Sequence, residues 1–304
     1  MKTHILRKIY RLIRIFLRKH GFILRRINMI DRRDVCNDPR QVLYLGGSQV
    51  IINVPLEKGR RKIFPVTAEY DPFYCALKLC LRNGNDKAKL KEVLTTYYAT
   101  VQPANALEWL GLGYEDAPEL AGARPWGAPP PWTDLTVREV DRNVNNDMLH
   151  DSGHGDKKLS VEQGWAHCGP ASEDKIQLEV NRLYIALDSI RRLGYDRNYG
   201  PGGDIGAKFL FNEEGDWRWT ISPGNHRIAI VSALGYKEIP VMAKSVVFRR
   251  DVDVWPNVLS GLYTRDGALK YFDNLFEGRV SPIIKPWLEY VQSLYAAEES
   301  TQKG

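Results

Sequence analysis

The sequence predicts an α+β protein, and three stretches of the chain indicate this class. A basic amphipathic segment comes first, and a long amphipathic helix is expected over 176–193. An aromatic-rich strand over 216–221 then runs through a Pro-Gly break into an apolar helix. Together they predict an N-terminal helix over 1–30, a mixed α/β region over 31–172 and a compact C-terminal domain over 173–304.

The first 30 residues carry nine of the 43 lysines and arginines and no acidic residue. Arg7, Arg11, Arg14 and Arg18 recur at helical spacing opposite a face of Ile, Leu and Phe. These arginines interrupt the apolar run, which argues against a transmembrane span or a usual signal peptide. We expect residues 1–26 to lie on an anionic membrane surface, which would make the protein cytoplasmic and peripheral on the inner face of the cell membrane. The alternatives are packing on the body or a partner, and a nucleic-acid arm or targeting peptide.

The remaining chain has 34 basic and 37 acidic residues, so the body is slightly acidic. This balance makes DNA an unlikely partner, because a DNA-binding surface needs a basic stripe in the folded part. The four cysteines form no C-x-x-C pair, which predicts reduced thiols.

The mixed region is expected to contain short elements joined by long loops. In chain order, the patterns predict strands over 42–45 and 50–54 around a turn at 46–48, and helices over 71–81, 87–98 and 104–110. Pro- and Gly-rich sequence over 114–135 and polar sequence over 143–172 predict irregular loops.

The C-terminal region has the clearest pattern. It predicts a helix over 176–193 closed by Gly194, a Gly-rich loop at 200–204, strands over 207–211 and 217–222, a helix over 225–234, a strand over 239–242, a helix over 264–276 and a last helix from Pro286.

The strand-to-helix turn at 222–227 carries the strongest functional signal. Asn225 stands where a helix N-cap is expected, after Gly224. Free backbone N–H groups and the helix dipole favour an anion at such a turn, phosphate above all. His226 and Arg227 place further donors at the same point.

This turn resembles the phosphate motif Gly-x-x-Arg-x-x-Ala of the ParB N-terminal and sulfiredoxin superfamily. The run 224–229 also resembles the Gly-Cys-His-Arg loop of sulfiredoxin, with Asn225 at the cysteine position. Ser189 and the isoleucine after it resemble a Ser-Ile or Thr-Ile pair of these domains, and Arg182 falls where sulfiredoxin has a nucleotide-contacting lysine. The exit sequence 235–241 matches as well. The resemblance covers about 176–245 and implies a ParB/sulfiredoxin-like nucleotide-binding domain.

The residues present argue against two of the activities found in this superfamily. Sulfinic acid repair needs a loop thiol, which Asn225 lacks. A ParB clamp needs a helix-turn-helix, whereas aromatic helices follow Val246. There remain a nucleotide-dependent phosphotransferase acting on a small hydroxylated acceptor, such as a sugar or an envelope-glycan precursor, and a non-catalytic nucleotide-binding scaffold or regulator. The nucleotide implied is ATP, ADP or CTP with Mg²⁺.

Residue roles follow from this resemblance and from the chemistry of phosphoryl transfer. The phosphate-binding candidates are Gly224, Asn225, His226, Arg227, Arg182 and Ser189. His226 is also expected to act as acid or base, and Glu179 or Asp204 would supply a carboxylate that orients and deprotonates the acceptor hydroxyl.

Two further groups of residues leave alternatives open. His150, His154, His167 and Cys168 lie within nineteen residues, but their spacing matches no standard zinc site, and a polar loop that closes over the active site is the favoured interpretation. The aromatic residues of the mixed region either form core or stack on a sugar or base: Tyr97, Tyr98, Trp109, Trp126, Trp132 and Trp165. Residues 40–170 would then recognise the acceptor.

Overall fold

The computed structural model describes residues 29–45, 49–152, 159–197 and 204–302. The predicted basic helix and the turn at 46–48 lie outside the described residues, as does most of the Gly-rich loop. Within the described ranges, no helix is both long enough and apolar enough to cross a membrane.

In the described part, seven strands form one mixed sheet in the order β1-β2-β7-β5-β6-β3-β4. The strands are β1 (Met29–Asp31), β2 (Gln49–Pro55), β3 (Gly59–Arg61), β4 (Phe64–Pro65), β5 (Gly206–Phe211), β6 (Trp217–Ile221) and β7 (Glu238–Phe248). Strand β2 runs antiparallel to β7, and β3 runs parallel to β6. Strands from both sides of residue 173 therefore pair within the same sheet.

The helices lie mostly between and after these strands. They are α2 (Gln41–Tyr44), α3 (Pro72–Arg82), α4 (Lys87–Thr100), α5 (Ala106–Leu110), α6 (Val137–Ser152), α7 (Glu173–Leu193), α8 (Asn225–Ala233), α9 (Pro256–Leu259), α10 (Arg265–Glu277) and α11 (Lys285–Gln302). Short 3₁₀ turns are η1 (Leu56–Lys58), η2 (Pro118–Gly122), η3 (Val161–Gln163), η4 (Arg249–Val254) and η5 (Pro282–Ile284). Helices and one mixed sheet together give an α+β fold at this coarse level, as the sequence predicts.

Two predicted elements are wrong. Residues 42–44 belong to the short helix α2, with Leu45 as its C-cap, and not to a strand, because Val42 and Leu45 pack on the sheet while Tyr44 is exposed. Residues 143–152 belong to the helix α6 and not to a loop. Its side chains Val144 and Met148 recur at helical spacing and pack inward.

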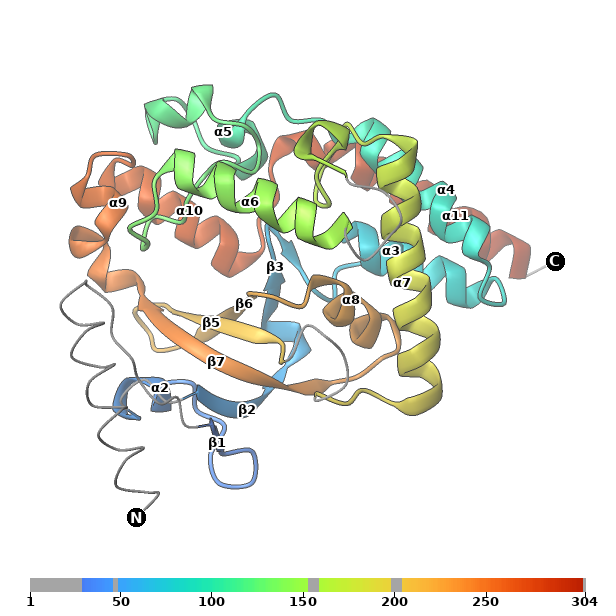
Figure 1. Ribbon diagram of the computed structural model, residues 1–304, viewed down its shortest axis with the longest axis horizontal. Helices are drawn as coiled ribbons and strands as arrows, with labels where there is room; N and C mark the ends of the chain where they lie inside the picture. Colours follow the sequence, from blue (N-terminus) through green and yellow to red (C-terminus); the bar gives the residue numbers. More distant parts are fainter. Residues whose placement is uncertain (1–28, 46–48, 153–158, 198–203, 303–304) are drawn as a thin grey trace, which may run out of the picture.

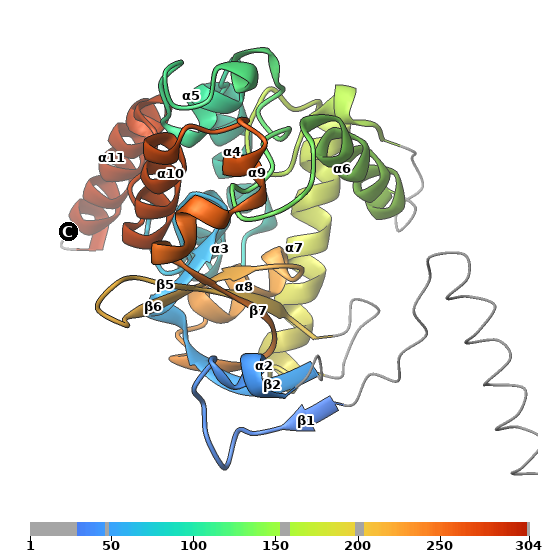
Figure 2. The ribbon, with the colours of Figure 1, turned by 90° about the vertical axis from the view of Figure 1, so that its left-hand side faces the viewer.

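The helices gather at one end of the sheet. Figures 1 and 2 show α5, α6, α9 and α10 on the side of the sheet away from β1 and β2, with the long helix α7 along another side. Helix α8 is buried between a helical core and the sheet core. Ile228 and Val231 pack on the sheet side, and Ala229, Ile230 and Ala233 pack on the helical side. A helix buried on all sides presents its polar groups at its ends, which makes the start of α8 the place to look for function.

Candidate functional site

The turn into α8 is fixed to the start of β5. The amide of Ser222 donates to the carbonyl of Gly206 at 2.8 Å, and the amide of Gly206 donates to the carbonyl of Pro223 at 3.2 Å. A Cβ on Gly206 would lie 1.9 Å from the Ser222 carbonyl oxygen, so this close approach requires glycine. The turn is therefore held rigidly by backbone contacts.

Gly224, and not Asn225, is the N-cap of α8. Its φ of 123° is a left-handed conformation that favours glycine, and a Cβ there would meet Ile205. Asn225 is the first helical residue, and no side chain caps the helix. The expected Asn225 cap is thus wrong, since the turn needs glycine's freedom at the cap position. Anion binding by the first amides of α8 stays a prediction.

His226 points into the protein and meets a buried charge pair from α7. Its Nε2 lies 2.6 Å from Oε2 of Glu179, whose other oxygen accepts from Nζ of Lys175 at 2.5 Å. The Glu179 side chain is fully buried, and His226 is 18% exposed. The two oxygens of Glu179 thus each contact one of these residues, and His226 is the partly exposed one of the two.

The charge state of this cluster follows from its neighbours. Burial opposes ionisation of Glu179, but the charges of Lys175 and His226 and the His226 hydrogen bond keep its pKa well below the usual range. An ionised carboxylate only accepts hydrogen bonds, so Nε2 of His226 carries the proton in this contact. Nδ1 is then the nitrogen with which His226 can exchange a proton.

The imidazole of His226 also stacks on Phe73, at the start of α3. Their centroids are 5.3 Å apart with an interplanar angle of 19°. On Phe73 the Arg61 guanidinium lies 4.4 Å from the ring centroid, and Asp71 binds that guanidinium at 2.7 and 2.8 Å. The same Asp71 accepts from the first amides of α3 and caps it. The position of His226 is therefore fixed by an aromatic and ionic frame that sequence reasoning missed.

His167 completes this frame and is not a metal ligand in the described structure. Nη1 of Arg61 lies 3.0 Å from its Nδ1, and since arginine only donates, Nδ1 accepts and the proton is on Nε2. Burial and the charges of Lys62 and Arg61 hold the pKa of His167 well below its usual range. The expected loop over the site is therefore wrong for His167, because the residue is fixed in the core.

The other members of the histidine and cysteine group do not join His167 in the described structure. Cys168 is buried, and burial raises its pKa to about 12, so it is an inert thiol. His154 and the side chain of His150 lie outside the described residues. Among the residues that are described, no group of three or more potential ligands could hold a metal ion.

Arg182 and Ser189 lie further along α7. Arg182 is one turn beyond Glu179 and contributes to the positive charge that lowers the pKa of Glu179. Seven residues of helix, about 10 Å, separate Arg182 from Ser189. The structure thus brings Arg182 to the Glu179 cluster and leaves Ser189, which is partly buried, toward the other end of the helix.

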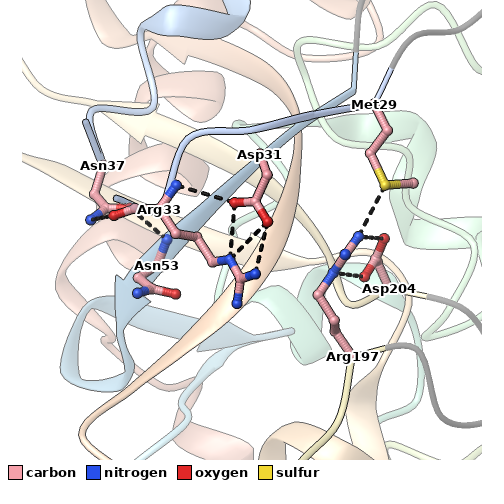
Figure 3. A network of polar contacts seen from close by, with 7 residues as sticks. All are labelled: Met29, Asp31, Arg33, Asn37, Asn53, Arg197 and Asp204. Carbon is pink, nitrogen blue, oxygen red and sulfur yellow. Dashed lines mark hydrogen bonds and ion pairs between the residues drawn. The ribbon is translucent and has the colours of Figure 1, made fainter. Parts of the chain in front are cut away.

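Asp204 is held by Arg197, close to Met29 of β1. Arg197 binds it through Nε and Nη2, each at 2.8 Å, and Nη2 also contacts the sulfur of Met29 (Figure 3). The charges of Arg227 and Asp204 both act on Tyr195, whose pKa burial raises to about 12. The charge of Arg227 therefore reaches Tyr195, while His226 contacts Glu179.

A cavity of about 370 Å³ lies next to the turn. Its walls include four of the tryptophans that the sequence offered for stacking, Trp109, Trp126, Trp132 and Trp165. Tyr97 and Tyr98 are instead buried in the helical core. Two lysines that sequence reasoning missed, Lys62 and Lys208, also line the cavity.

The cavity is connected to the turn by the chain itself. Ser222, which lines the cavity, precedes His226 by four residues, and four residues of chain span at most about 14 Å. The cavity wall Trp165 also makes an edge contact with His167, at a centroid distance of 4.7 Å. The cavity therefore adjoins the turn that leads into α8.

No family model matches this chain, and no curated protein and no solved structure is significantly similar to it.

Proposed function

We propose that the protein is a nucleotide-dependent phosphotransferase that acts on a small hydroxylated acceptor, such as a sugar or an envelope-glycan precursor. The observation that carries the proposal is the position of His226 at the uncapped start of α8, held at 2.6 Å by the buried, ionised Glu179. An anion-binding helix terminus and a positioned imidazole are two groups that can assist transfer of a phosphoryl unit to a hydroxyl.

The nucleotide would be ATP, ADP or CTP, in a domain of ParB/sulfiredoxin-like type. The order of a long helix, two antiparallel strands, a Gly-x-His-Arg turn, a buried helix and a returning strand supports this assignment. The first amides of α8 and the guanidinium of Arg227 bind the phosphates. Mg²⁺ is expected to come with the nucleotide and to be held mainly by its phosphates, because the nearby Glu179 and Asp204 are both engaged by cations.

In the transfer step, His226 takes up the proton that the acceptor hydroxyl loses. The acceptor oxygen forms a bond to the terminal phosphorus, the bond between that phosphorus and the bridging oxygen breaks, and the shortened nucleotide leaves with the electron pair. In its neutral form, His226 takes the proton of the acceptor hydroxyl on Nδ1 and becomes the charged imidazolium. Glu179 does not touch the substrate and instead positions His226 and stabilises its charged form.

Nucleotide binding and turnover test this proposal together. Calorimetry with ATP, ADP and CTP in the presence of Mg²⁺ should show binding that Arg227→Ala weakens at least tenfold, because a bidentate phosphate contact is lost. Arg250→Ala is the matched control, since Arg250 is highly exposed and far along the chain from the turn. Unchanged affinity in Arg227→Ala would reject the phosphate site.

Turnover separates the enzyme from a scaffold that only binds nucleotide. Incubation with nucleotide, Mg²⁺ and a panel of sugars and polyols should give a product about 80 Da heavier than the acceptor, because one phosphoryl unit is added. His226→Gln should keep nucleotide affinity and lose product formation by about 10²-fold or more, the range for a general base. Equal binding and no product from the wild-type protein would favour the scaffold.

The membrane association of residues 1–26 belongs to the same proposal. Nine cations on an amphipathic segment favour an anionic bilayer surface. Flotation with anionic and neutral liposomes should recover the full chain on the anionic ones only, and a chain without residues 1–26 on neither. Equal flotation of the two chains would reject the membrane role.

A further inference from the structure

The cavity beside the turn is lined by tryptophans and by three cationic side chains, Lys62, Lys208 and Arg279. Its lining comes from β5 and β6 and from α6 and α10, which Figures 1 and 2 show on the same side of the sheet. Lys208 of β5 and its register partner Thr220 of β6 both line it. The side chain of Lys62 reaches it from the turn between β3 and β4.

The lining around the two lysines carries more positive than negative charge, although the charge of Asp147 acts on Lys62. In the described structure neither Lys62 nor Lys208 forms an ion pair, and Lys62 lies instead 5.4 Å from the ring centroid of Trp165. Asp147 is the carboxylate among the lining residues, against the cations Lys62, Lys208 and Arg279. Burial and the charge of Lys244 lower the pKa of the half-buried Lys208, whereas Lys62 is exposed. A bound anion would relieve this excess of positive charge.

The backbone of Lys62 gives independent support. Lys62 and Ile63 form a two-residue hairpin loop between β3 and β4, and Lys62 has a φ of 57°. Such positions normally hold Gly, Asn or Asp, because a side chain there strains the backbone. Strain of this kind persists where the surrounding structure requires it, and it is concentrated at ligand-binding positions.

The aromatic walls favour a bulky ring over a flat one. Trp109 and Trp165 meet at 74°, and Trp126 and Trp165 meet at 50°. Trp132 and Tyr271 meet at 82°. A nucleobase stacks best between parallel rings, which none of these pairs offers, whereas a sugar ring presents C–H faces in several directions. Asn143, Asn274 and Thr220 supply polar groups for hydroxyls.

The geometry points to an anionic carbohydrate as the acceptor: a sugar ring bearing a carboxylate or a phosphate group, bound in the tryptophan cavity with its negative charge at Lys62 and Lys208. The cavity volume of about 370 Å³ suits one or two such rings. This identification of the acceptor rests on the proposed phosphotransferase, because Ser222 joins the cavity wall to the turn that would hold the nucleotide.

The test measures sugar binding without nucleotide, so that it does not depend on turnover. The full chain is titrated with glucuronate, glucose 6-phosphate, glucose and inorganic phosphate, and binding is followed by tryptophan fluorescence and calorimetry. At least one of the two charged sugars should bind tenfold or more tightly than glucose and than phosphate alone, and the better one identifies the source of the charge. Equal binding of glucose, equal binding of phosphate, or no binding of any probe would overturn the inference.

Variants locate the binding. Lys62→Gln and Lys208→Gln should each weaken the preferred charged sugar about tenfold, and Lys62→Arg should restore part of it. Lys237→Gln is the matched control, because Lys237 is exposed and does not line the cavity. Circular dichroism and thermal melts confirm that each variant is folded. Unchanged sugar affinity in both folded glutamine variants would overturn the inference.

Nucleotide titrations of the same variants keep the two proposals distinguishable. Lys62→Gln should leave ATP affinity unchanged, whereas Arg227→Ala should lower it. A loss of ATP affinity in Lys62→Gln would mean that the cavity holds the nucleotide, which overturns the acceptor assignment and leaves nucleotide binding intact. Sugar binding without any nucleotide binding would reject the phosphotransferase and leave the anionic carbohydrate site intact.

Discussion

The two carboxylates that the sequence offered for catalysis, Glu179 and Asp204, occupy opposite environments. Glu179 is fully buried between Lys175 and His226, whereas Asp204 is held by both fork nitrogens of Arg197 near β1. A guanidinium stays protonated at all ordinary pH values, so the Asp204 pair has no proton to exchange. An imidazole can gain or lose one, so the Glu179 pair can take part in proton transfer. The nature of the partner, more than the carboxylate itself, decides which of the two can serve a reaction.

Replacing Glu179 should give the largest loss of stability. Glu179→Gln leaves Lys175 buried and without its counter-charge, which typically costs about 3–5 kcal/mol. Urea unfolding should show a lower midpoint with an unchanged slope. Glu173→Gln, on the same helix in an exposed pair with Lys91, is the control and should lose less than about 1 kcal/mol. Similar losses in the two variants would remove the contrast between buried and exposed carboxylates.

The pH dependence of stability should also show that Glu179 is ionised in the folded protein. Folding lowers the pKa of Glu179 below its ordinary value of 4.5, so the folded state binds fewer protons there. Its contribution is complete above pH 4.5 and is lost as pH falls toward the folded pKa. The stability gap between wild type and Glu179→Gln, measured by urea unfolding at several pH values, should therefore shrink as the pH falls below 4.5. A gap that grows in acid would show that Glu179 is not ionised in the fold.

The backbone contact between Gly206 and Ser222 should be the next most sensitive point. Gly206→Ala places a Cβ against the Ser222 carbonyl oxygen and displaces the turn, at a cost of about 1–3 kcal/mol. Nucleotide affinity should fall with it if the turn binds phosphate. Gly122→Ala is the control, because nothing lies within 4 Å of its added Cβ and its φ is not positive. Thermal melts that shift equally in both variants would contradict the role given to the junction.

The sequence predicted the elements that depend on local pattern. The helical spacing from Ile176 and the strand, turn and helix around Gly224 are confirmed, because periodicity and glycine report on the chain within a few residues. The contact between Glu179 and His226 could be guessed only as a general need for a carboxylate. Their separation of 47 residues leaves no local trace in the sequence.

The frame around His226 could not be predicted for a similar reason. Arg61 and His167 meet across 106 residues, and single-sequence patterns carry no information on such pairings. Lys62 gave one signal that could have been read. A two-residue gap between β3 and β4 invites a Gly or Asn, and a lysine there departs from turn chemistry. The polar composition of α6 hid its helical spacing, since Asn-rich sequence favours loops until a buried face is counted.

Asp204→Asn should have a smaller effect than Glu179→Gln. Both partners of the Asp204 pair are slightly exposed, at 10% and 14%, so water can partly solvate Arg197 after the change. Loss of two charge-assisted hydrogen bonds then costs about 1.5 kcal/mol. Turnover should be retained, because Arg197 holds Asp204 away from proton transfer. Loss of product formation in a stable Asp204→Asn variant would reverse the ranking of the two carboxylates.

Of the carboxylates compared, the exposed Asp31 should contribute least to the free energy of unfolding. Its contact with Arg33, two residues away, lowers its pKa to about 2, through the side-chain hydrogen bond first of all (Figure 3). A lowered pKa contributes stability above the unfolded value of 3.8 that is lost as pH falls toward 2. The pair is exposed and joins near neighbours in the chain, so much of the contact can persist in the unfolded state. NMR titration should therefore find the low pKa while Asp31→Asn changes the unfolding free energy by less than about 1 kcal/mol. A larger loss would mean that the pair stabilises the sheet at the β1 edge. The exposure of an ion pair would then not predict its contribution to the stability of this protein.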